Sequence, residues 1–286
     1  MIITFKEPPP DHPAEGIGST YYKVISLISI AKYLNIDYIH SKYRIGHNYN
    51  NINEDEWNKL YYDFFNLQKI TKSFDNYDLT DYKIITNHEL TLEHFNYINN
   101  SDKNKKEIFY FVEPFNITLN DPNKFYPLIR NDIIDAYNEV NYNRPLIYNK
   151  NKKNIAIHIR VYNSNDDSYY YEGYLNYSCD RFKYNENMYI SIINKIINKY
   201  PDYDIHIYSQ NDFKERYPNI YANSKFNIHL DTDILDLLHH MIKADVLLLG
   251  FSCLSHLAGI YNTNTVIYLN YHMPLILNNW IDINSF

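Results

Sequence analysis

The sequence predicts an α/β protein with two domains, each built around a parallel sheet. Short apolar strand patterns alternate with amphipathic helix patterns along the whole second half of the chain. The first half starts in the same way, with a strand pattern, a loop rich in Pro and Gly, and a helix pattern. The length of 286 residues agrees with two domains of about 150 residues each.

The second half carries strand and helix patterns in strict alternation. Apolar and polar residues alternate in the strands, and apolar residues recur at helical spacing in the helices. Short connections leave only a parallel sheet with right-handed crossovers and helices on both faces. We therefore predict a Rossmann-like domain with a five-stranded sheet. The predicted strands are 154–161, 203–208, 226–230, 245–249 and 265–269, and the predicted helices are 186–200, 212–217, 232–243 and 253–261.

The first half is less regular, although it also predicts an α/β domain. Strand patterns lie at 2–5, 36–40, 83–86 and 107–111, and helix patterns lie at 20–34, 53–67 and 121–140. A polar segment with one proline, 141–153, is the best candidate for a linker. We predict an N-terminal α/β domain at 1–145 and a C-terminal Rossmann-like domain at 150–286.

The composition is that of a globular protein, with 45% hydrophobic and 21% charged residues. A net charge of −7 argues against nucleic-acid binding, because phosphate recognition needs a basic surface. The two cysteines are too few for a disulfide framework and fit a reducing compartment. No signal-peptide core is found, and the longest apolar run, 246–249, is far shorter than the roughly 20 residues of a membrane helix. We expect a cytoplasmic protein, and we attribute its 32 tyrosines to the codon bias of an A/T-rich genome, as in some large DNA viruses.

In an open parallel sheet, ligands bind outside the carboxyl ends of the strands. His158 and Arg160 lie near the end of a predicted strand and on one face of it, because alternate residues of a strand point the same way. A charged Arg in a mostly buried strand is costly unless it meets an anion, and the guanidinium fork fits a diphosphate. An internal salt bridge to a carboxylate explains Arg160 equally well.

Two further segments follow predicted strands. The segment 250–258 (GFSCLSHLA) opens a helix, and a helix start with nearby hydroxyls suits a phosphate. Capping by Ser252 or Ser255 is the simpler interpretation of this motif alone. Ser209, after another strand, is placed to reach a ribose or base, although the start of a short helix explains it equally well.

Gly16 and Gly18 lie between the first predicted strand and the first predicted helix, where glycines let a backbone approach a ligand closely. Tyr21 occupies the third position of a GxGxxG pattern, which disfavours a nicotinamide or flavin site. The sequence also lacks GxSxG, GxxxxGK[ST] and HExxH, which removes the commonest hydrolase, NTPase and zinc-protease interpretations.

Two motifs resemble metal sites. Asp231 and Asp233 form a DxD pattern that would suit Mn²⁺ or Mg²⁺ on a nucleotide-sugar, but they also open a predicted helix, where capping is the favoured interpretation. His239 and His240 are adjacent in the same helix and diverge by about 100 degrees, so they do not chelate one metal as an i, i+4 pair would. We interpret them as surface or packing histidines.

Taken together, these places resemble the fucosyltransferase superfamily, which includes the α1,2-, α1,6- and protein O-fucosyltransferases. Its members carry an HxRR-type strand end and, later, a stretch of the form SSFSxxA after an apolar strand. Here HIR at 158–160, YSQND at 208–212 and SCLSHLA at 252–258 appear in that order. The resemblance covers 150–270, and GIGSTYYKVISLISIAKYL at 16–34 is similar, more loosely, to the family's Gly-rich loop and helix.

The resemblance implies a GT-B arrangement of two Rossmann-like domains, with GDP-fucose held by the C-terminal domain and the acceptor by the N-terminal domain and the cleft. Arg160 would bind the β-phosphate, His158 the nucleoside side, and Asp236 guanine or ribose. The stretch at 252–258 would bind the diphosphate. The donor-binding residues implied in this way are Gly16, Gly18, His158, Arg160, Ser209, Asp236, Ser252, Cys253 and Ser255.

The sequence departs from the family pattern in three places. The Asp that usually follows HxRR is displaced into 165–167. Val161 stands where the second Arg of HxRR is expected, and Cys253 stands in place of the second Ser. Loss of one positive charge near the donor leaves the nucleotide open between GDP, UDP and dTDP.

We predict an inverting, metal-independent glycosyltransferase that moves fucose from GDP-fucose to a glycan hydroxyl, with no cofactor. Fixed positive charge at the leaving diphosphate is the main catalytic requirement, and Arg160 is its candidate. The candidate general bases are the loop carboxylates Asp167, Glu172, Asp166 and Glu15, in that order. Two alternatives stay open: a DxD-dependent transferase of a UDP- or dTDP-sugar, and a non-catalytic module that binds a nucleotide or sugar.

Overall fold

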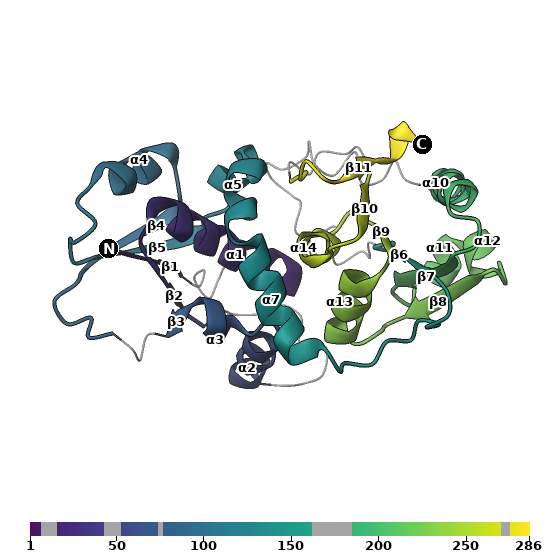
Figure 1. Cartoon of the computed structure of the whole chain (residues 1–286), viewed down its shortest axis with the longest axis horizontal. Coiled ribbons are helices and arrows are strands. Elements are labelled where there is room, and N and C mark those ends of the chain that lie inside the picture. The colour runs from purple at the N-terminus through teal and green to yellow at the C-terminus, as the bar shows by residue number, and fades with distance from the viewer. Residues whose placement is uncertain (7–15, 43–52, 74–76, 162–184, 270–274) are drawn as a thin grey trace. The chain divides into compact units, whose positions relative to one another are not determined.

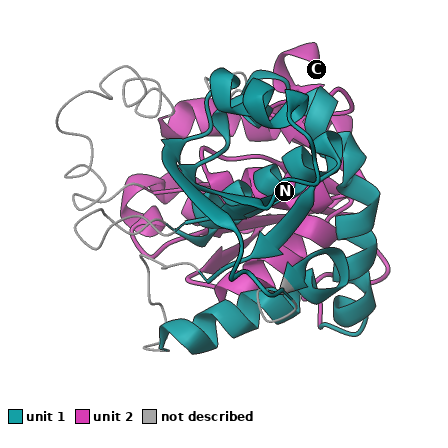
Figure 2. Cartoon of the chain, turned by 90° about the vertical axis from the view of Figure 1, so that its left-hand side faces the viewer, with its two compact units in different colours: residues 1–144 teal, residues 145–286 magenta. Residues whose placement is uncertain are grey.

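The computed structural model describes residues 1–6, 16–42, 53–73, 77–161, 185–269 and 275–286. These residues form two compact units, 1–144 and 145–286, which Figure 2 shows in different colours. Each unit is an α/β structure around its own parallel sheet (Figure 1). Among the described residues, no helix combines the length and the apolar character that a membrane span requires.

The sheet of the N-terminal unit has the order β3-β2-β1-β5-β4. The strands are β1 (Ile2–Phe5), β2 (Asp37–His40), β3 (Lys72–Ser73), β4 (Lys83–Glu89) and β5 (Glu107–Glu113). Neighbouring strands all run parallel. The central strand β1 is buried along its whole length, whereas the edge strand β4 is largely exposed.

The helices of this unit are α1 (Ile17–Leu34), α2 (Glu54–Phe64), α3 (Leu67–Ile70), α4 (Leu92–Asn100), α5 (Asn116–Asn120), α6 (Pro122–Phe125), the 3₁₀ helix η2 (Tyr126–Leu128) and α7 (Arg130–Asn141). Helix α1 is buried over most of its surface, so its polar residues need internal partners. Ser26, for example, bonds the hydroxyl of Tyr126 at 2.9 Å. Aromatic rings fill much of the remaining core, and Tyr21 stacks on Phe65 with ring centroids 3.8 Å apart.

The sheet of the C-terminal unit has six strands in the order β11-β10-β9-β6-β7-β8, one more than the sequence predicts. The strands are β6 (Asn154–His158), β7 (Asp204–Ser209), β8 (Phe226–Leu230), β9 (Val246–Leu248), β10 (Thr265–Tyr268) and β11 (Ile281–Asp282). The additional strand, β11, pairs in parallel with β10 through Ile267 and Ile281. Two residues are too few to show strand periodicity, which is why the sequence did not indicate it.

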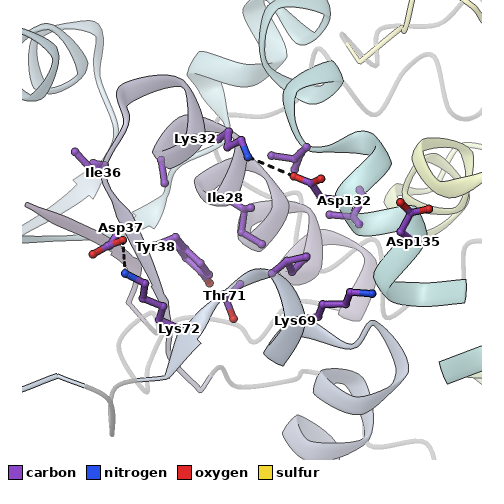
Figure 3. A pocket seen from close by; sticks show the side chains of 14 residues that line it. Ile28, Lys32, Ile36, Asp37, Tyr38, Lys69, Thr71, Lys72, Asp132 and Asp135 are labelled. Atoms are coloured by element: carbon purple, nitrogen blue, oxygen red, sulfur yellow. Dashed lines mark hydrogen bonds and ion pairs between the residues drawn. The ribbon is translucent and has the colours of Figure 1, made fainter. Parts of the chain in front are cut away.

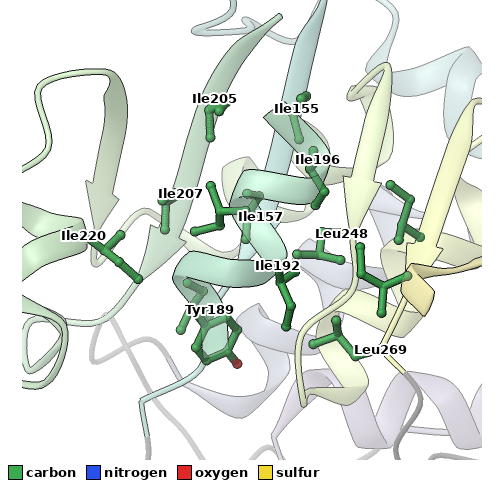
Figure 4. Close-up of a cluster of buried hydrophobic side chains, with 14 of the residues drawn as sticks. Ile155, Ile157, Tyr189, Ile192, Ile196, Ile205, Ile207, Ile220, Leu248 and Leu269 are labelled. Carbon is green, nitrogen blue, oxygen red and sulfur yellow. The ribbon is translucent and has the colours of Figure 1, made fainter. Parts of the chain in front are cut away.

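The helices of the C-terminal unit are α10 (Glu186–Lys199), α11 (Phe213–Arg216), α12 (Pro218–Tyr221), α13 (Ile234–Lys243) and α14 (Cys253–Tyr261), followed by the 3₁₀ helix η4 (Ile283–Ser285). One face of the sheet is apolar, and there Ile192 and Ile196 of α10 pack on Ile155 and Ile157 of β6 (Figure 4). On the opposite face, α13 contacts β6, and aromatic and histidine side chains replace the isoleucines.

Two predicted helices of the N-terminal half are broken in the structure. The predicted helix 53–67 ends at Phe64, and Asn66 adopts a left-handed conformation with φ 50° before α3 begins. The predicted helix 121–140 is three pieces, α6, η2 and α7. Pro127 lies within η2, and a proline lacks the N–H that a continuous α-helix needs.

Candidate functional site

The carboxyl ends of the C-terminal strands bring three predicted site residues, and Gly250 of the segment 250–258, to one edge of the sheet. His158 ends β6, Ser209 ends β7, and Gly250 lies between β9 and α14. Arg160 follows β6, and it is half-buried. Because β6 lies between β7 and β9, these side chains come from adjacent strands. This edge is where open α/β sheets bind ligands.

Gly250 shows how closely the backbone packs at this edge. A Cβ atom on Gly250 would lie 2.0 Å from the carbonyl oxygen of His158 and 3.0 Å from its carbonyl carbon. Both are backbone atoms, so no flexible side chain can move aside. The loop after β9 therefore crosses directly over the end of β6, and only glycine fits there.

The same loop leads into α14, whose first turn is tied by two serines. Ser252 is the N-cap, and its hydroxyl oxygen accepts a hydrogen bond from the Leu254 N–H at 3.2 Å. The hydroxyl oxygen of Ser255 accepts from the Gly250 N–H at 3.1 Å. It also lies 3.1 Å from the Gly250 carbonyl and 2.9 Å from the Ser252 carbonyl.

Ser255 is fully buried by these contacts. Ser252 caps the helix, whereas the Ser255 hydroxyl bonds the backbone of the loop. The start of α14 nevertheless keeps the positive end of its dipole beside Gly250, with half-buried Cys253 in its first turn.

His158 is a buried imidazole in a positive environment. Burial, together with the nearby charges of Arg160 and His256, lowers its pKa from 6.5 to about 3. Its Nδ1 atom has no hydrogen-bond partner among the described residues. An unsatisfied buried nitrogen is costly, so this Nδ1 atom needs a polar partner that the described residues do not supply.

His256 is a neighbour of this group that the sequence analysis did not single out. It lies one turn after Ser252 in α14, is buried, and places Nδ1 3.1 Å from the Ser252 carbonyl. Burial lowers its pKa to about 4. The sequence could have indicated this neighbour, because the i, i+4 spacing of Ser252 and His256 puts both on one side of the helix.

Ser209 has a role inside the sheet. Its buried hydroxyl donates to the Ile159 carbonyl at 2.6 Å, which ties the ends of β6 and β7 together. Its own carbonyl accepts from the N–H of Asp231 at 3.0 Å. Asp231 has a left-handed φ of 49°.

The two aspartates of the DxD pattern lie in different structural positions. Asp233 is the N-cap of α13, and its Oδ1 accepts from the Leu235 N–H at 2.9 Å and from the Asp236 N–H at 3.3 Å. Asp231 lies before the cap, outside the helix. In the part of the chain that the structure describes, no three His, Cys, Asp or Glu side chains are grouped to hold a metal ion. Asp236 lies half-buried in the first turn of α13.

His239 and His240 are packing residues, since both are buried in α13. The ring of His240 lies 5.6 Å from that of Tyr148 and 5.8 Å from that of Tyr208. His240 therefore belongs to the face of the sheet that α13 covers, which we call the polar face.

The predicted glycines of the N-terminal half begin α1 and do not form a separate loop. Gly16 is the N-cap and Gly18 is already inside the helix, which starts at Ile17 instead of residue 20. The candidate bases Glu15, Asp166, Asp167 and Glu172 lie outside the described residues.

A cavity of about 440 Å³ occurs in the N-terminal unit, between α1, β2, α3 and α7 (Figure 3). Its rim carries charges that pair with one another: Lys72 lies 2.8 Å from Asp37, and Lys32 lies 3.5 Å from Asp132. Asp37 begins β2, so the cavity lies toward the amino ends of the strands. It is therefore at the opposite edge from the one where parallel sheets bind substrates.

No protein-family model and no curated protein matches the sequence. Solved structures match it in fold. A crystal structure of POFUT1, a protein O-fucosyltransferase, in complex with GDP-fucose matches with a TM-score of 0.53 and 9% identity, over 98% of this chain and 97% of that one. A second crystal form of that complex matches with a TM-score of 0.52 and 10% identity, over 99% and 98% of the two chains.

At such low identity the likeness concerns the fold. It extends over nearly the whole chain, whereas the sequence motifs indicated a resemblance for 150–270 and, more loosely, for 16–34. The resemblance to fucosyltransferases expected from the sequence is thus confirmed at the level of structure: the chain has a POFUT1-like GT-B fold of two α/β units.

Proposed function

We propose that this protein is an inverting, metal-independent fucosyltransferase that uses GDP-fucose and a glycan hydroxyl. The observation that carries the proposal is the edge at His158, Arg160 and Gly250. A guanidinium, a neutral buried imidazole and a helix start converge there from two adjacent strand ends. The likeness to a GDP-fucose-bound structure supports the choice of donor.

The reaction needs the nucleoside diphosphate to leave as an anion while the acceptor hydroxyl attacks from the opposite face. Positive charge already oriented at the phosphates stabilises that leaving group without reorganisation. Arg160 supplies a guanidinium fork, and the start of α14 supplies the positive end of a helix dipole. In our proposal these two groups hold the β- and α-phosphates.

The remaining residues divide into those that contact the donor and those that position them. We assign His158 Nδ1 to a polar atom of the nucleoside and Asp236 to the base or ribose. We assign Cys253 to the diphosphate side of the donor site, because it lies in the first turn of α14. Ser209, Ser252 and Ser255 act by holding the strand ends and the loop in place through the bonds described above.

For the proton acceptor we keep the loop carboxylates in the order Asp167, Glu172, Asp166 and Glu15. A carboxylate within reach of the acceptor hydroxyl removes its proton as the bond to fucose forms. Alanine variants of the four, compared by kcat, identify the residue. Four wild-type rates would contradict the whole set.

Arg160→Ala tests the proposal directly. We expect it to lower turnover of GDP-fucose about 10²-fold or more, because one oriented charge is lost from the transition state. Arg160→Lys restores the charge without the fork and should recover only part of the rate. Arg216→Ala, which removes an exposed arginine of α11 in the same unit, is the matched control. Full activity in Arg160→Ala would overturn the assignment.

The donor is tested by thermal shift with GDP, UDP, dTDP and CDP. A ligand at 100 times its dissociation constant stabilises the native state by about 2.7 kcal/mol. We expect the largest shift with GDP, and we expect Arg160→Ala to abolish it.

One observation favours a different donor as the second candidate. Val161, in the position of the family's second Arg, is buried in the apolar cluster under α10, so this site has no second guanidinium there. A larger shift with UDP or dTDP would replace fucose while keeping the transferase. Binding without any donor hydrolysis would favour a non-catalytic module.

A further inference from the structure

The N-terminal unit contains an ion pair of an unusual kind for this protein. The Nζ atom of Lys23, in the middle of α1, lies 2.6 Å from Oε1 of Glu113, the last residue of β5. The Lys23 side chain is 2% exposed and that of Glu113 is 17% exposed. In eight other ion pairs between described residues, the lysine side chain is at least 48% exposed.

Stability alone does not explain this pair. The rings of Phe5 and Phe115 lie 6.0 and 5.7 Å from Lys23 Nζ, so the ammonium is held among aromatic groups. Taking both charges out of water costs free energy, and a buried ion pair is often no more stable than two well-packed apolar side chains. A charged pair in such a position is better explained by a task that needs the charge.

The position of the carboxylate indicates the task. Glu113 lies at the carboxyl end of β5, beside the end of β1, where the Lys6 N–H bonds the Phe111 carbonyl at 2.9 Å. This is the edge of the N-terminal sheet at which parallel sheets bind ligands. Lys23 is closed off, whereas Glu113 remains partly open to solvent, so the carboxylate is the member of the pair that a ligand can reach.

We propose that Glu113 is an acceptor-binding residue, whose carboxylate accepts a hydrogen bond from a hydroxyl of the acceptor glycan. Lys23 is its positioning residue: the ammonium neutralises the carboxylate and leaves it one orientation. No proton leaves the hydroxyl at Glu113 in this role. The inference rests on the proposed transferase function, in which the donor occupies the C-terminal unit.

The test is retention of the full-length protein on an oligosaccharide array in the presence of GDP. We expect Glu113→Gln to lower retention on the glycans that hold the wild type at least tenfold, with an unchanged thermal shift by GDP. Asp81→Asn is the matched control, because Asp81 pairs with Lys106 at 2.8 Å in the same unit while both side chains are exposed. It should be retained like the wild type.

A second variant distinguishes loss of glycan binding from loss of folding. Glu113→Gln leaves the Lys23 ammonium without its anion, which is destabilising, whereas the double variant Lys23→Met, Glu113→Leu removes both charges. We expect the double variant to melt at or above the wild-type temperature and still to lose glycan retention.

The outcomes separate the two proposals. Undiminished retention of the folded double variant, or no glycan retention by a wild type that hydrolyses GDP-fucose, overturns the role of Glu113 alone. No GDP shift and no donor hydrolysis in the wild type overturn the transferase proposal itself.

Discussion

The two faces of the C-terminal sheet are built from alternate residues of the same strands, yet they have different roles. Ile155 and Ile157 of β6 face α10, together with Ile205 and Ile207 of β7, in a cluster of hydrophobic residues (Figure 4). The residues between them on β7 are His206 and Tyr208, which belong to the face that α13 covers. One face is a core, and the other carries titratable groups up to the proposed site.

The polar face is held by ring contacts and hydrogen bonds. His206 Nδ1 lies 3.0 Å from Nε2 of His229, and the two rings stack with centroids 5.3 Å apart. Tyr148 packs on His206 and donates its hydroxyl to the His240 carbonyl at 2.7 Å. Such contacts depend on protonation state, whereas those between isoleucines do not. The contacts of the two faces should therefore be lost under different conditions.

The largest effect is expected where the polar face meets the site. Gly250→Ala places a Cβ 2.0 Å from the His158 carbonyl oxygen, so the backbone of the loop or of β6 must move. We expect loss of more than about 4 kcal/mol in the free energy of unfolding, measured by urea denaturation. Gly259→Ala is the control, because its Cβ would meet side-chain atoms at 3.0 Å or more, and it should cost clearly less.

The apolar face should respond to lost volume. Ile157→Ala removes a fully buried side chain between α10 and the sheet, and we expect a loss of about 2–5 kcal/mol at neutral pH. The difference between variant and wild type should stay the same when unfolding is repeated at pH 5. A strongly pH-dependent difference would mean that the two faces are coupled.

The polar face should make the protein sensitive to acid. Burial lowers the pKa of His206 from 6.5 to about 4, and His229 and His240 act in the same direction while Asp204 opposes them. Between these pH values the unfolded chain binds more protons than the folded one, so stability is lost as pH falls from about 6.5 to 4. Each pKa unit corresponds to about 1.4 kcal/mol.

This prediction is checked by the free energy of unfolding as a function of pH. His206→Leu should flatten the profile in that window, although His158 and His256 still contribute, because burial lowers their pKa values as well. A profile of unchanged slope would show that His206 titrates normally in the folded protein.

The smallest effect is expected from a single hydroxyl. Tyr148→Phe removes the hydrogen bond to the His240 carbonyl and leaves the ring in place. We expect a loss of about 1 kcal/mol in thermal unfolding, with an unchanged shift by GDP. A loss as large as that of Ile157→Ala would mean that the polar face is packed as tightly as the apolar one.

Periodicity predicted much of this architecture. The strands at 2–5 and 226–230 and the helix at 253–261 have the predicted bounds, because alternation and helical spacing are local properties of the chain. Helix α4 and strand β11 did not appear in the prediction. Strand β11 exists only through its pairing with β10.

The candidate site was likewise predicted only in part. His158, Arg160 and the helix start at Ser252 were visible as residues at strand ends, since the carboxyl edge of a parallel sheet is where ligands bind. The roles of Ser209 and Ser255 were not visible, because a serine's hydrogen-bond partner is set by the fold. Both hydroxyls bond the backbone of the sheet edge and its loop.

The sequence by itself determined which face each strand residue takes and where a helix such as α14 begins, because both follow from the spacing of apolar residues and from capping side chains over a few positions. The tertiary structure alone decided that Gly250 meets His158 and that Lys23 meets Glu113, 90 residues away. Such contacts join segments that no local pattern relates. Their energetic consequences depend on burial, which exists only once the sheets and helices have packed together.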